Sequence, residues 1–296
     1  MANGIHLTFV DTRNLYGTMN TGTVRLSNLT NSDKRMLMQI HDMLTLEELT
    51  NYTLTPDDKR RVFAAHRQQV GEYYGFDGRK MFMADQKNLD GSVFEITRDY
   101  VEANPNGWTD IPEDILKIRE NLPGVALGHP VADCPVVIAE DKTRGITTVA
   151  HCGGEMIDKK LPMMAVEALY REGSKPEDVH VYVGAKAGPN WTYTNNTPVW
   201  AKDEQLWSEA ITPGQQQTAN GSIDVYYIDL QKALDKQFSA VGLHQGQVIY
   251  DPHDTITDSS YYSNSEARVN PEKFGRQFVG AFYQEDNQKD ERGRSR

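Results

Sequence analysis

The chain has 296 residues, of which 38% are hydrophobic and 25% are charged, and its net charge is −11. This length allows one large core or two modest domains, and the acidic balance argues against a general nucleic-acid binder, which needs a basic face. No apolar run reaches the roughly 20 residues that span a bilayer, and no signal-peptide pattern begins the sequence, so we expect a cytoplasmic protein.

The first 125 residues are predicted to alternate between strands and helices. Thr55 and Pro56 provide an N-cap and a first-turn proline for one of the helices, and residues 104–107 form a turn. The predicted elements are strands at 5–10, 80–84 and 92–98, and helices at 33–47, 56–74 and 113–121.

The most informative local pattern is a β-hairpin centred on Lys142 and Thr143. Two apolar, β-branched runs flank a polar turn that ends at Gly145. If the strands pair symmetrically about this turn, Cys134 lies opposite His151, with Cβ atoms roughly 4.5–5.5 Å apart. A thiol and an imidazole at that separation can share a metal ion or a proton, whereas a one-residue slip would separate them onto opposite faces.

The second half of the chain has the same mixed character. Gly173–Pro176 is expected to end a helix, the charged and polar tail 284–296 is predicted to be disordered, and no internal repeat is present. The pattern favours a single α/β or α+β domain over residues 1–283, with mixed sheets packed by helices. The predicted elements are helices at 156–172 and 229–241, strands at 179–183, 224–228, 247–250 and 278–282, and a tight loop at 184–189.

Four short motifs occur in a fixed order. The first three are Pro-Val-Ala-Asp-Cys at 130–134, Ala-His-Cys-Gly-Gly-Glu at 150–155 and Val-Gly-Ala-Lys-Ala-Gly-Pro at 183–189. The fourth has three parts: Tyr-Tyr-Ser-Asn at 261–264, then Arg268, then Phe-Gly-Arg-Gln-Phe at 274–278. Over roughly residues 5–283 the chain thereby resembles the YfiH-like family, also called the laccase-domain or polyphenol-oxidase-like family. The corresponding family motifs read Thr-Ala-Asp-Cys, Ala-His-Ala-Gly-Trp-Arg-Gly, Leu-Gly-Pro-Ala-Ile-Gly-Pro, and Phe-Phe-Ser-Tyr-Arg-Arg followed by Thr-Gly-Arg.

The resemblance implies an α/β domain and a zinc-binding enzyme of purine nucleoside metabolism. Members of the family cleave the glycosidic bond of adenosine, inosine, guanosine or methylthioadenosine with phosphate, and some deaminate adenosine. The implied partners are therefore a nucleoside and phosphate, without nucleic acid or membrane. The family's site is His, Cys and His around a metal with an arginine nearby, and Cys134, His151 and Arg67 match three of these four positions.

The first family histidine is absent. It belongs to a Gln-Val-His-Gly motif, and in the matching segment 85–91 its position is taken by Asn88. Asparagine is a poorer zinc ligand than imidazole or thiolate. The third ligand therefore stays open among Asn88, His129 and Cys152, although adjacent strand residues point to opposite faces, which makes Cys152 structural by default.

Several neighbours complete the candidate site. Gly153 and Gly154 begin a helix, where exposed backbone N–H groups favour phosphate, and Gly154 with Glu155 replaces the family's Trp-Arg. Asp133 is expected to orient His151 or a backbone turn. The predicted catalytic residues are Cys134, His151, Arg67 and Asp133, and the predicted substrate-binding residues are Arg67, Gly153, Gly154, Lys186 and Arg276.

The leading functional hypothesis is a purine nucleoside phosphorylase-like enzyme. One alternative is a metal-free cysteine hydrolase in which Cys134 attacks and His151 is the base. Another is a family member that binds purines without catalysis. A multi-copper oxidase is disfavoured, because none of the eight histidines forms a His-x-His pair.

Overall fold

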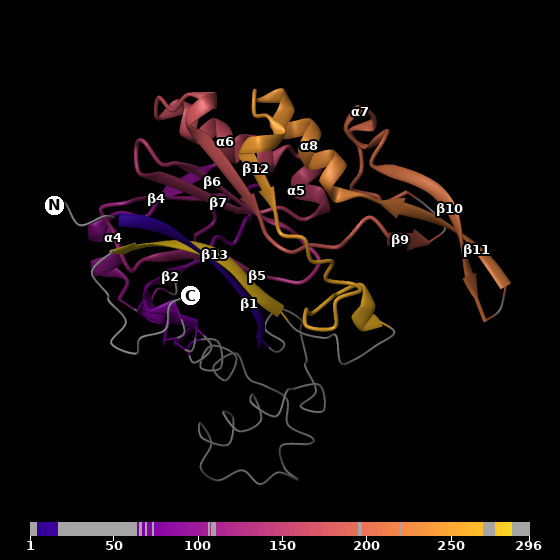
Figure 1. The fold of residues 1–296 in the computed structure, drawn as a ribbon, viewed down its shortest axis with the longest axis horizontal. Helices are drawn as coiled ribbons and strands as arrows, with labels where there is room; N and C mark the ends of the chain where they lie inside the picture. Colours follow the sequence, from indigo (N-terminus) through magenta and orange to yellow (C-terminus); the bar gives the residue numbers. More distant parts are fainter. Residues whose placement is uncertain are drawn as a thin grey trace, which may run out of the picture.

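The structure is a computed structural model of the chain, and it describes residues 5–16 and 64–285, except 65, 66, 69, 73, 106, 108–110, 195, 196, 220 and 269–275. The described part contains a helical layer, a six-stranded sheet and a four-stranded sheet, with a small three-stranded sheet at one end (Figure 1). It confirms the α/β class. The predicted helix 33–47 lies outside the described residues. The predicted helix 56–74 is described in part, and its described residues, such as Arg67 and Val70, are helical.

The six-stranded sheet lies in the middle of the molecule and has the order β12-β8-β6-β7-β4-β3. The predicted hairpin forms its centre, as β6 and β7. The outer pairs β12-β8 and β3-β4 are parallel and the inner pairs are antiparallel, so the sheet is mixed. Its strands are β3 (Val93–Glu95), β4 (Ile115–Arg119), β6 (Val136–Asp141), β7 (Ile146–His151), β8 (Val179–Val183) and β12 (Val248–Tyr250).

The four-stranded sheet has the order β1-β13-β5-β2. Its strands are β1 (Ile5–Tyr16), β2 (Met81–Phe82), β5 (Ala126–Val131) and β13 (Arg276–Glu285). The last strand in sequence, β13, lies between β1 and β5 and is antiparallel to both. The predicted strands at both ends of the chain are therefore confirmed, whereas β5 has no counterpart among the predictions.

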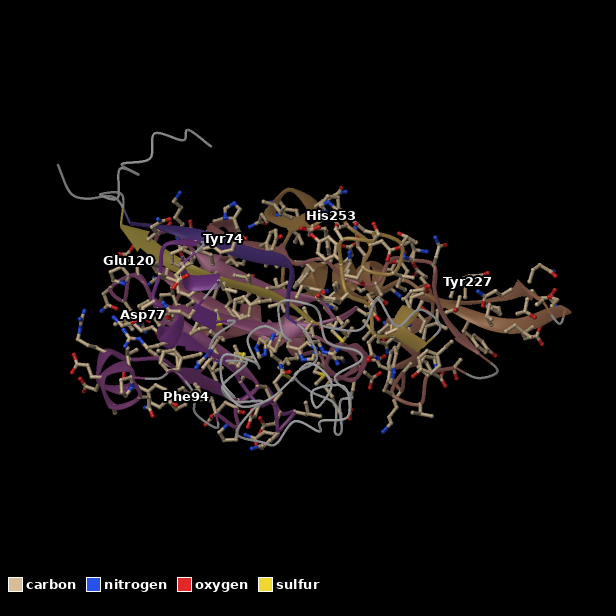
Figure 2. The ribbon with its side chains drawn as sticks, turned by 90° about the horizontal axis from the view of Figure 1, so that it is seen from below. Tyr74, Asp77, Phe94, Glu120, Tyr227 and His253 are labelled. Carbon is tan, nitrogen blue, oxygen red and sulfur yellow. The ribbon has the colours of Figure 1, made fainter. Side chains whose placement is uncertain are left out.

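Helices cover one face of the six-stranded sheet (Figure 1), and a small sheet of order β10-β11-β9 projects from the body, with Tyr227 on it in Figure 2. None of the described helices is long and apolar enough to cross a membrane. The helices are α4 (Arg98–Ala103), α5 (Gly154–Asp158), α6 (Leu161–Arg171), α7 (Glu204–Trp207) and α8 (Leu230–Ala240), and the small sheet contains β9 (Trp191–Thr194), β10 (Ile211–Thr218) and β11 (Gly221–Ile228).

The alternation of side chains along the hairpin creates two separate cores. Val137 and Ala150 belong to the cluster between the six-stranded sheet and the helices. Val136 and Val149 belong to the cluster between the two sheets, together with residues of β5 and β13. Because successive strand side chains leave opposite faces, His151 at the end of β7 continues the row of Val149 and points into the layer between the sheets.

Two predicted helices differ from the structure. The predicted helix 113–121 is wrong, because its centre is the strand β4, buried between β3 and β7; a fully buried strand has no alternation to distinguish it from a short helix. The predicted helix 156–172 is divided into α5 and α6. The break is at Lys160, whose φ is 65°, two residues before Pro162.

Candidate active site

The hairpin brings Cys134 and His151 together, but in a register two residues away from the predicted one. His151 pairs with Val136, and beyond it the Cys152 N–H donates to the Pro135 carbonyl at 2.8 Å, so Gly153 lies across from Cys134. An even shift keeps the two side chains on one face. A Cβ at Gly153 would lie 3.3 Å from Cys134 Sγ, 3.4 Å from Met156 Sδ and 3.8 Å from His151 Nε2, so the thiol and the Nε2 side of the imidazole both face Gly153.

A second histidine lies beside this pair. His129, on β5, has its ring centroid 5.8 Å from that of His151. It is 4% exposed, and its Nε2 has no hydrogen-bond partner among the described residues. Burial, followed by the repulsion that a protonated His151 would exert, holds the pKa of His129 well below its usual 6.5, so its ring is neutral at pH 7.

Gln86 holds His151 from the side opposite the thiol. Its side-chain oxygen is 2.8 Å from His151 Nδ1, and its Nε2 donates to the His151 carbonyl at 2.8 Å and to the Asp114 carbonyl at 3.2 Å. Gln86 belongs to the segment that follows β2 and has a positive φ of 53°. The only sequence signal for it is its place two residues before Asn88 in the segment that resembles Gln-Val-His-Gly.

Asn88 itself does not reach the pair. It is exposed, and its amide donates to Ser92 Oγ at 3.1 Å. The three backbone N–H groups that follow it donate to the buried Asp114 carboxylate at 2.7 to 2.9 Å. The loop is thus tied down so that Gln86 faces the site and Asn88 faces away.

The pair is electrically neutral at pH 7. Burial, followed by the charge of Asp133, raises the pKa of the Cys134 thiol to about 12, although Arg276 opposes this shift. Burial, followed by Arg276, lowers the pKa of His151 to about 4. Arg276 begins β13, and its charge acts on both groups, which places this predicted anion-binding residue at the site.

Asp133 binds a neighbouring segment rather than His151. Its Oδ1 accepts from Thr255 Oγ1 at 2.8 Å and its Oδ2 from the Ser265 N–H at 2.7 Å. Its carbonyl accepts from the Ala187 N–H at 2.8 Å. Asp133 has a φ of 77°, which aspartate tolerates better than most residues. Through these three hydrogen bonds, Asp133 anchors the backbone turn that presents Cys134.

Gly154 is covered by an indole ring. A Cβ at this position would lie 2.6 to 2.8 Å from ring atoms of Trp200, which stacks on Trp191 with centroids 6.1 Å apart. Helix α5, which starts here, has only five residues. Trp200 therefore packs on the Cβ side of Gly154, and a side chain at this position would collide with the indole ring.

The remaining predicted residues have other surroundings. Arg67 is buried, and its Nη1 donates to the Met81 carbonyl at 3.2 Å. The Lys186 ammonium lies 5.1 Å from the centre of the Tyr250 ring. Cys152 is fully buried in the cluster between the sheet and the helices, on the opposite face from His151 as expected.

The implied zinc site is not assembled by these residues. Cys134 and His151 are adjacent, and of the three candidates for the third ligand only His129 lies beside them, because Asn88 is exposed and Cys152 faces the other core. In the part of the chain that the structure describes, no group of three His, Cys, Asp or Glu side chains lies close enough together to hold a metal ion. The described donor set therefore does not fit a zinc ion bound as the family resemblance implies.

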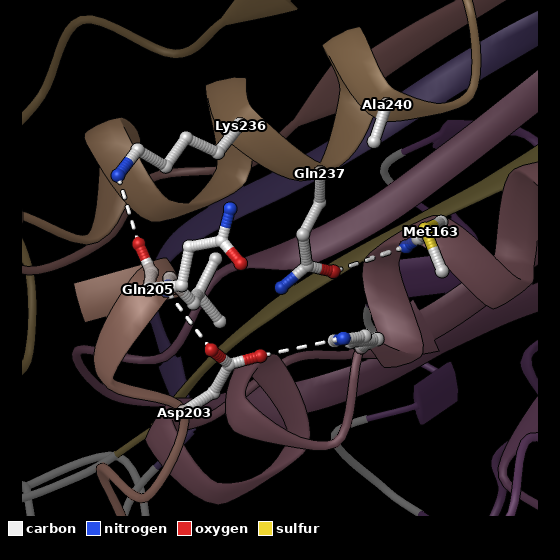
Figure 3. Close-up of a pocket in the computed structure, with 8 residues that line it drawn as sticks. Met163, Asp203, Gln205, Lys236, Gln237 and Ala240 are labelled. Carbon is white, nitrogen blue, oxygen red and sulfur yellow. Dashed lines mark hydrogen bonds and ion pairs between the residues drawn. The ribbon is translucent and has the colours of Figure 1, made fainter. Parts of the chain in front are cut away.

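A cavity of about 360 Å³ lies elsewhere, among α6, α7 and α8 (Figure 3). Its charged groups are already paired: Lys160 lies 3.3 Å from Asp203, and Lys236 Nζ donates to the Gln205 carbonyl at 3.0 Å. It is on the helical side of the six-stranded sheet, whereas the Cys134–His151 pair faces the other sheet. We therefore do not assign it to the candidate active site.

The comparison with protein-family models decides the family. The model described as "Multi-copper polyphenol oxidoreductase laccase" matches residues 46–283. The chain belongs to this family. Solved structures of the YfiH-like family share its fold: YfiH of Bacillus licheniformis has a TM-score of 0.57 at 20% identity, covering 75% of this chain and 81% of that one. YlmD of Geobacillus stearothermophilus has a TM-score of 0.60 at 19% identity, covering 75% of this chain and 80% of that one.

Two relatives of this YfiH-like chain are named for an activity. A Mycobacterium tuberculosis protein named purine nucleoside phosphorylase is 26% identical over 210 residues, covering 70% of this chain and 75% of that protein. A Corynebacterium glutamicum protein with the same name is 28% identical over 209 residues, covering 70% of this chain and 77% of that protein.

Proposed function

We propose that the protein is a purine nucleoside phosphorylase-like enzyme with its centre at Cys134 and His151. The observation that carries the proposal is the convergence of Cys134 Sγ and His151 Nε2 on Gly153. The charge of Arg276 acts on both groups. The names of the relatives supply the substrate class.

The proposed reaction exchanges one bond at the ribose. A phosphate oxygen bonds to C1′ while the C1′–N9 bond breaks, and its electron pair leaves with the purine, which takes up a proton. The neutral Nε2 of His151 accepts that proton from the incoming phosphate and passes it to the purine. The guanidinium of Arg276 binds the phosphate, for which its planar fork is suited.

The test is to incubate the protein with phosphate and adenosine, inosine, guanosine or methylthioadenosine, and to measure the free base that is released. Deamination is tested separately, as ammonia released from adenosine. The substitution His151→Ala should lower kcat/KM by about 100-fold or more, the usual contribution of a general base. The exposed His180 on β8 provides the matched control, His180→Ala, which should retain activity. No base release by the unmodified protein from any of the four nucleosides would contradict the proposal.

A second candidate is a purine-binding protein without catalysis. It is favoured by the exposure of Asn88, because the family's first ligand is then missing from the site. Binding of a nucleoside without turnover would support it. Turnover that is abolished by Cys134→Ala would exclude it. The cysteine hydrolase gains no support, because a thiol with a pKa of about 12 is not a thiolate at neutral pH.

A further inference from the structure

The orientation of the Gln86 amide is determined by its surroundings. Its nitrogen end lies 2.8 Å from the His151 carbonyl oxygen and 3.2 Å from the Asp114 carbonyl oxygen. Carbonyl oxygens only accept hydrogen bonds, so the amide NH₂ must be at this end. The amide oxygen is therefore the atom 2.8 Å from His151 Nδ1.

This orientation also determines where the His151 ring carries its proton. An amide oxygen accepts, so Nδ1 must be the donor, and in the neutral imidazole the lone pair is then on Nε2. Nε2 is the ring atom that faces Gly153, where Cys134 Sγ also lies. We propose that Gln86 is a positioning residue that holds His151 with its proton on Nδ1 and its acceptor nitrogen toward the bound ligand.

Gln86 is itself rigidly held, as this role requires. It is 8% exposed and its backbone has a φ of 53°. The neighbouring N–H groups of Asp85 and Lys87 donate to the carbonyls of Ile111 and Pro112 at 2.7 and 3.0 Å. An amide fixed at its backbone and at both ends of its side chain can orient a histidine ring.

The consequence concerns the ligand. A ligand group that hydrogen-bonds to the acceptor nitrogen His151 Nε2 must be a donor, so it carries an O–H or N–H, such as protonated phosphate or a sugar hydroxyl. This part rests on the proposed function. The proton position of His151 does not rest on it, because it is a property of the protein without ligand.

The first experiment measures that proton position directly. In the ligand-free, full-length protein labelled with ¹⁵N-histidine, long-range ¹H–¹⁵N correlation spectra at pH 7 should show His151 protonated at Nδ1, with the signal assigned by its loss in His151→Ala. If His151 is protonated at Nε2, or is an imidazolium, the proposal is wrong whatever the enzyme activity.

Variants then test whether Gln86 is the cause. Gln86→Met has similar length and no acceptor, so the Nδ1-protonated form should no longer dominate and kcat should fall about 10- to 100-fold, with a smaller change in KM. Gln86→Glu keeps an acceptor and should keep the proton on Nδ1, although it loses both donors. Asn88→Ala, in the same loop but exposed, should change neither measurement.

The outcomes separate the two proposals. An unchanged proton position in folded Gln86→Met refutes the positioning role. If that variant does not fold, the spectrum of Gln86→Glu decides, because loss of the Nδ1-protonated form there also refutes the role. If the spectra are as expected but no base is released from any nucleoside, the positioning role of Gln86 is supported and phosphorolysis is refuted.

Discussion

At the scale of single residues, the site contains a protonated thiol beside a neutral imidazole rather than an ion pair. Nucleophilic cysteines depend on a lowered pKa, whereas burial raises that of Cys134 to about 12. We therefore expect iodoacetamide to label Cys134 slowly in the folded protein at pH 7.5, far more slowly than free glutathione. Mass spectrometry of digested protein measures this rate, with urea-unfolded protein as the control for full labelling. If Cys134 of the folded protein is labelled as fast as glutathione, the result would support the cysteine hydrolase hypothesis.

The contact between Gly154 and Trp200 predicts an asymmetry between two glycines. Gly154→Ala places a methyl group 2.6 Å from the indole and should lower the free energy of unfolding by about 1–3 kcal/mol, as overpacking does. At Gly246 a Cβ meets nothing within 4 Å and φ is not positive, so Gly246→Ala is the matched control and should be nearly neutral. Urea denaturation followed by circular dichroism compares the two. Equal stabilities would mean that the ring moves aside without cost.

At the scale of secondary structure, an ion-pair network fastens β4 to its neighbours. Lys117 and Arg119, on β4, pair with Glu95 on β3 and with Glu172 at the end of α6. Burial alone would raise the pKa of Glu95, but the hydrogen bonds from Lys117 and Arg119 outweigh it and lower that pKa. The same two cations lower the pKa of Glu172.

These shifts predict a pH dependence of stability. A carboxyl whose pKa is lower in the folded than in the unfolded state stabilises the fold above its unfolded pKa and loses this contribution as the pH falls through its folded pKa. Glu172→Gln should therefore cost at most about 1 kcal/mol at pH 7, since its side chain is partly exposed, and almost nothing near pH 3. Urea titrations at both pH values measure the difference. An equal cost at both would show that charge is not its origin.

The elements differ in how far the sequence determines them. The hairpin β6–β7 and helix α8 were predictable because β-branched runs around a polar turn, and an Asp229 cap before a periodic run, are local signals. Strand β4 was mistaken for a helix because both of its faces are buried. The hairpin placed Cys134 and His151 on one face, but its exact register depends on turn geometry. Gln86 was missed because its role comes from contacts with residues distant in sequence, His151 and the Asp114 carbonyl.

At the scale of the whole molecule, Asp133 joins the segment before β6 to the segment after β12. The partners of its carboxylate, Thr255 and Ser265, are 122 and 132 residues away in sequence. Asp133→Gly tolerates the positive φ but removes the carboxylate, and should cost about 1.5–3 kcal/mol per lost charged hydrogen bond. Asp133→Asn keeps an acceptor and should cost less. Hydrogen exchange of residues 251–268 should accelerate in the glycine variant, and unchanged exchange there would contradict the role.

The position of β13 has a consequence for synthesis. Among the strands that the structure describes it is the last to be synthesised, yet it is an inner strand of its sheet and carries Arg276 at its start. Until it emerges, the strands on either side of it, β1 and β5, have no partner between them, and their unpaired edges invite pairing with other chains. A nascent chain from which β13 has not yet emerged therefore lacks Arg276 near Cys134 and His151, and its strand edges are most open to pairing with other chains at that stage.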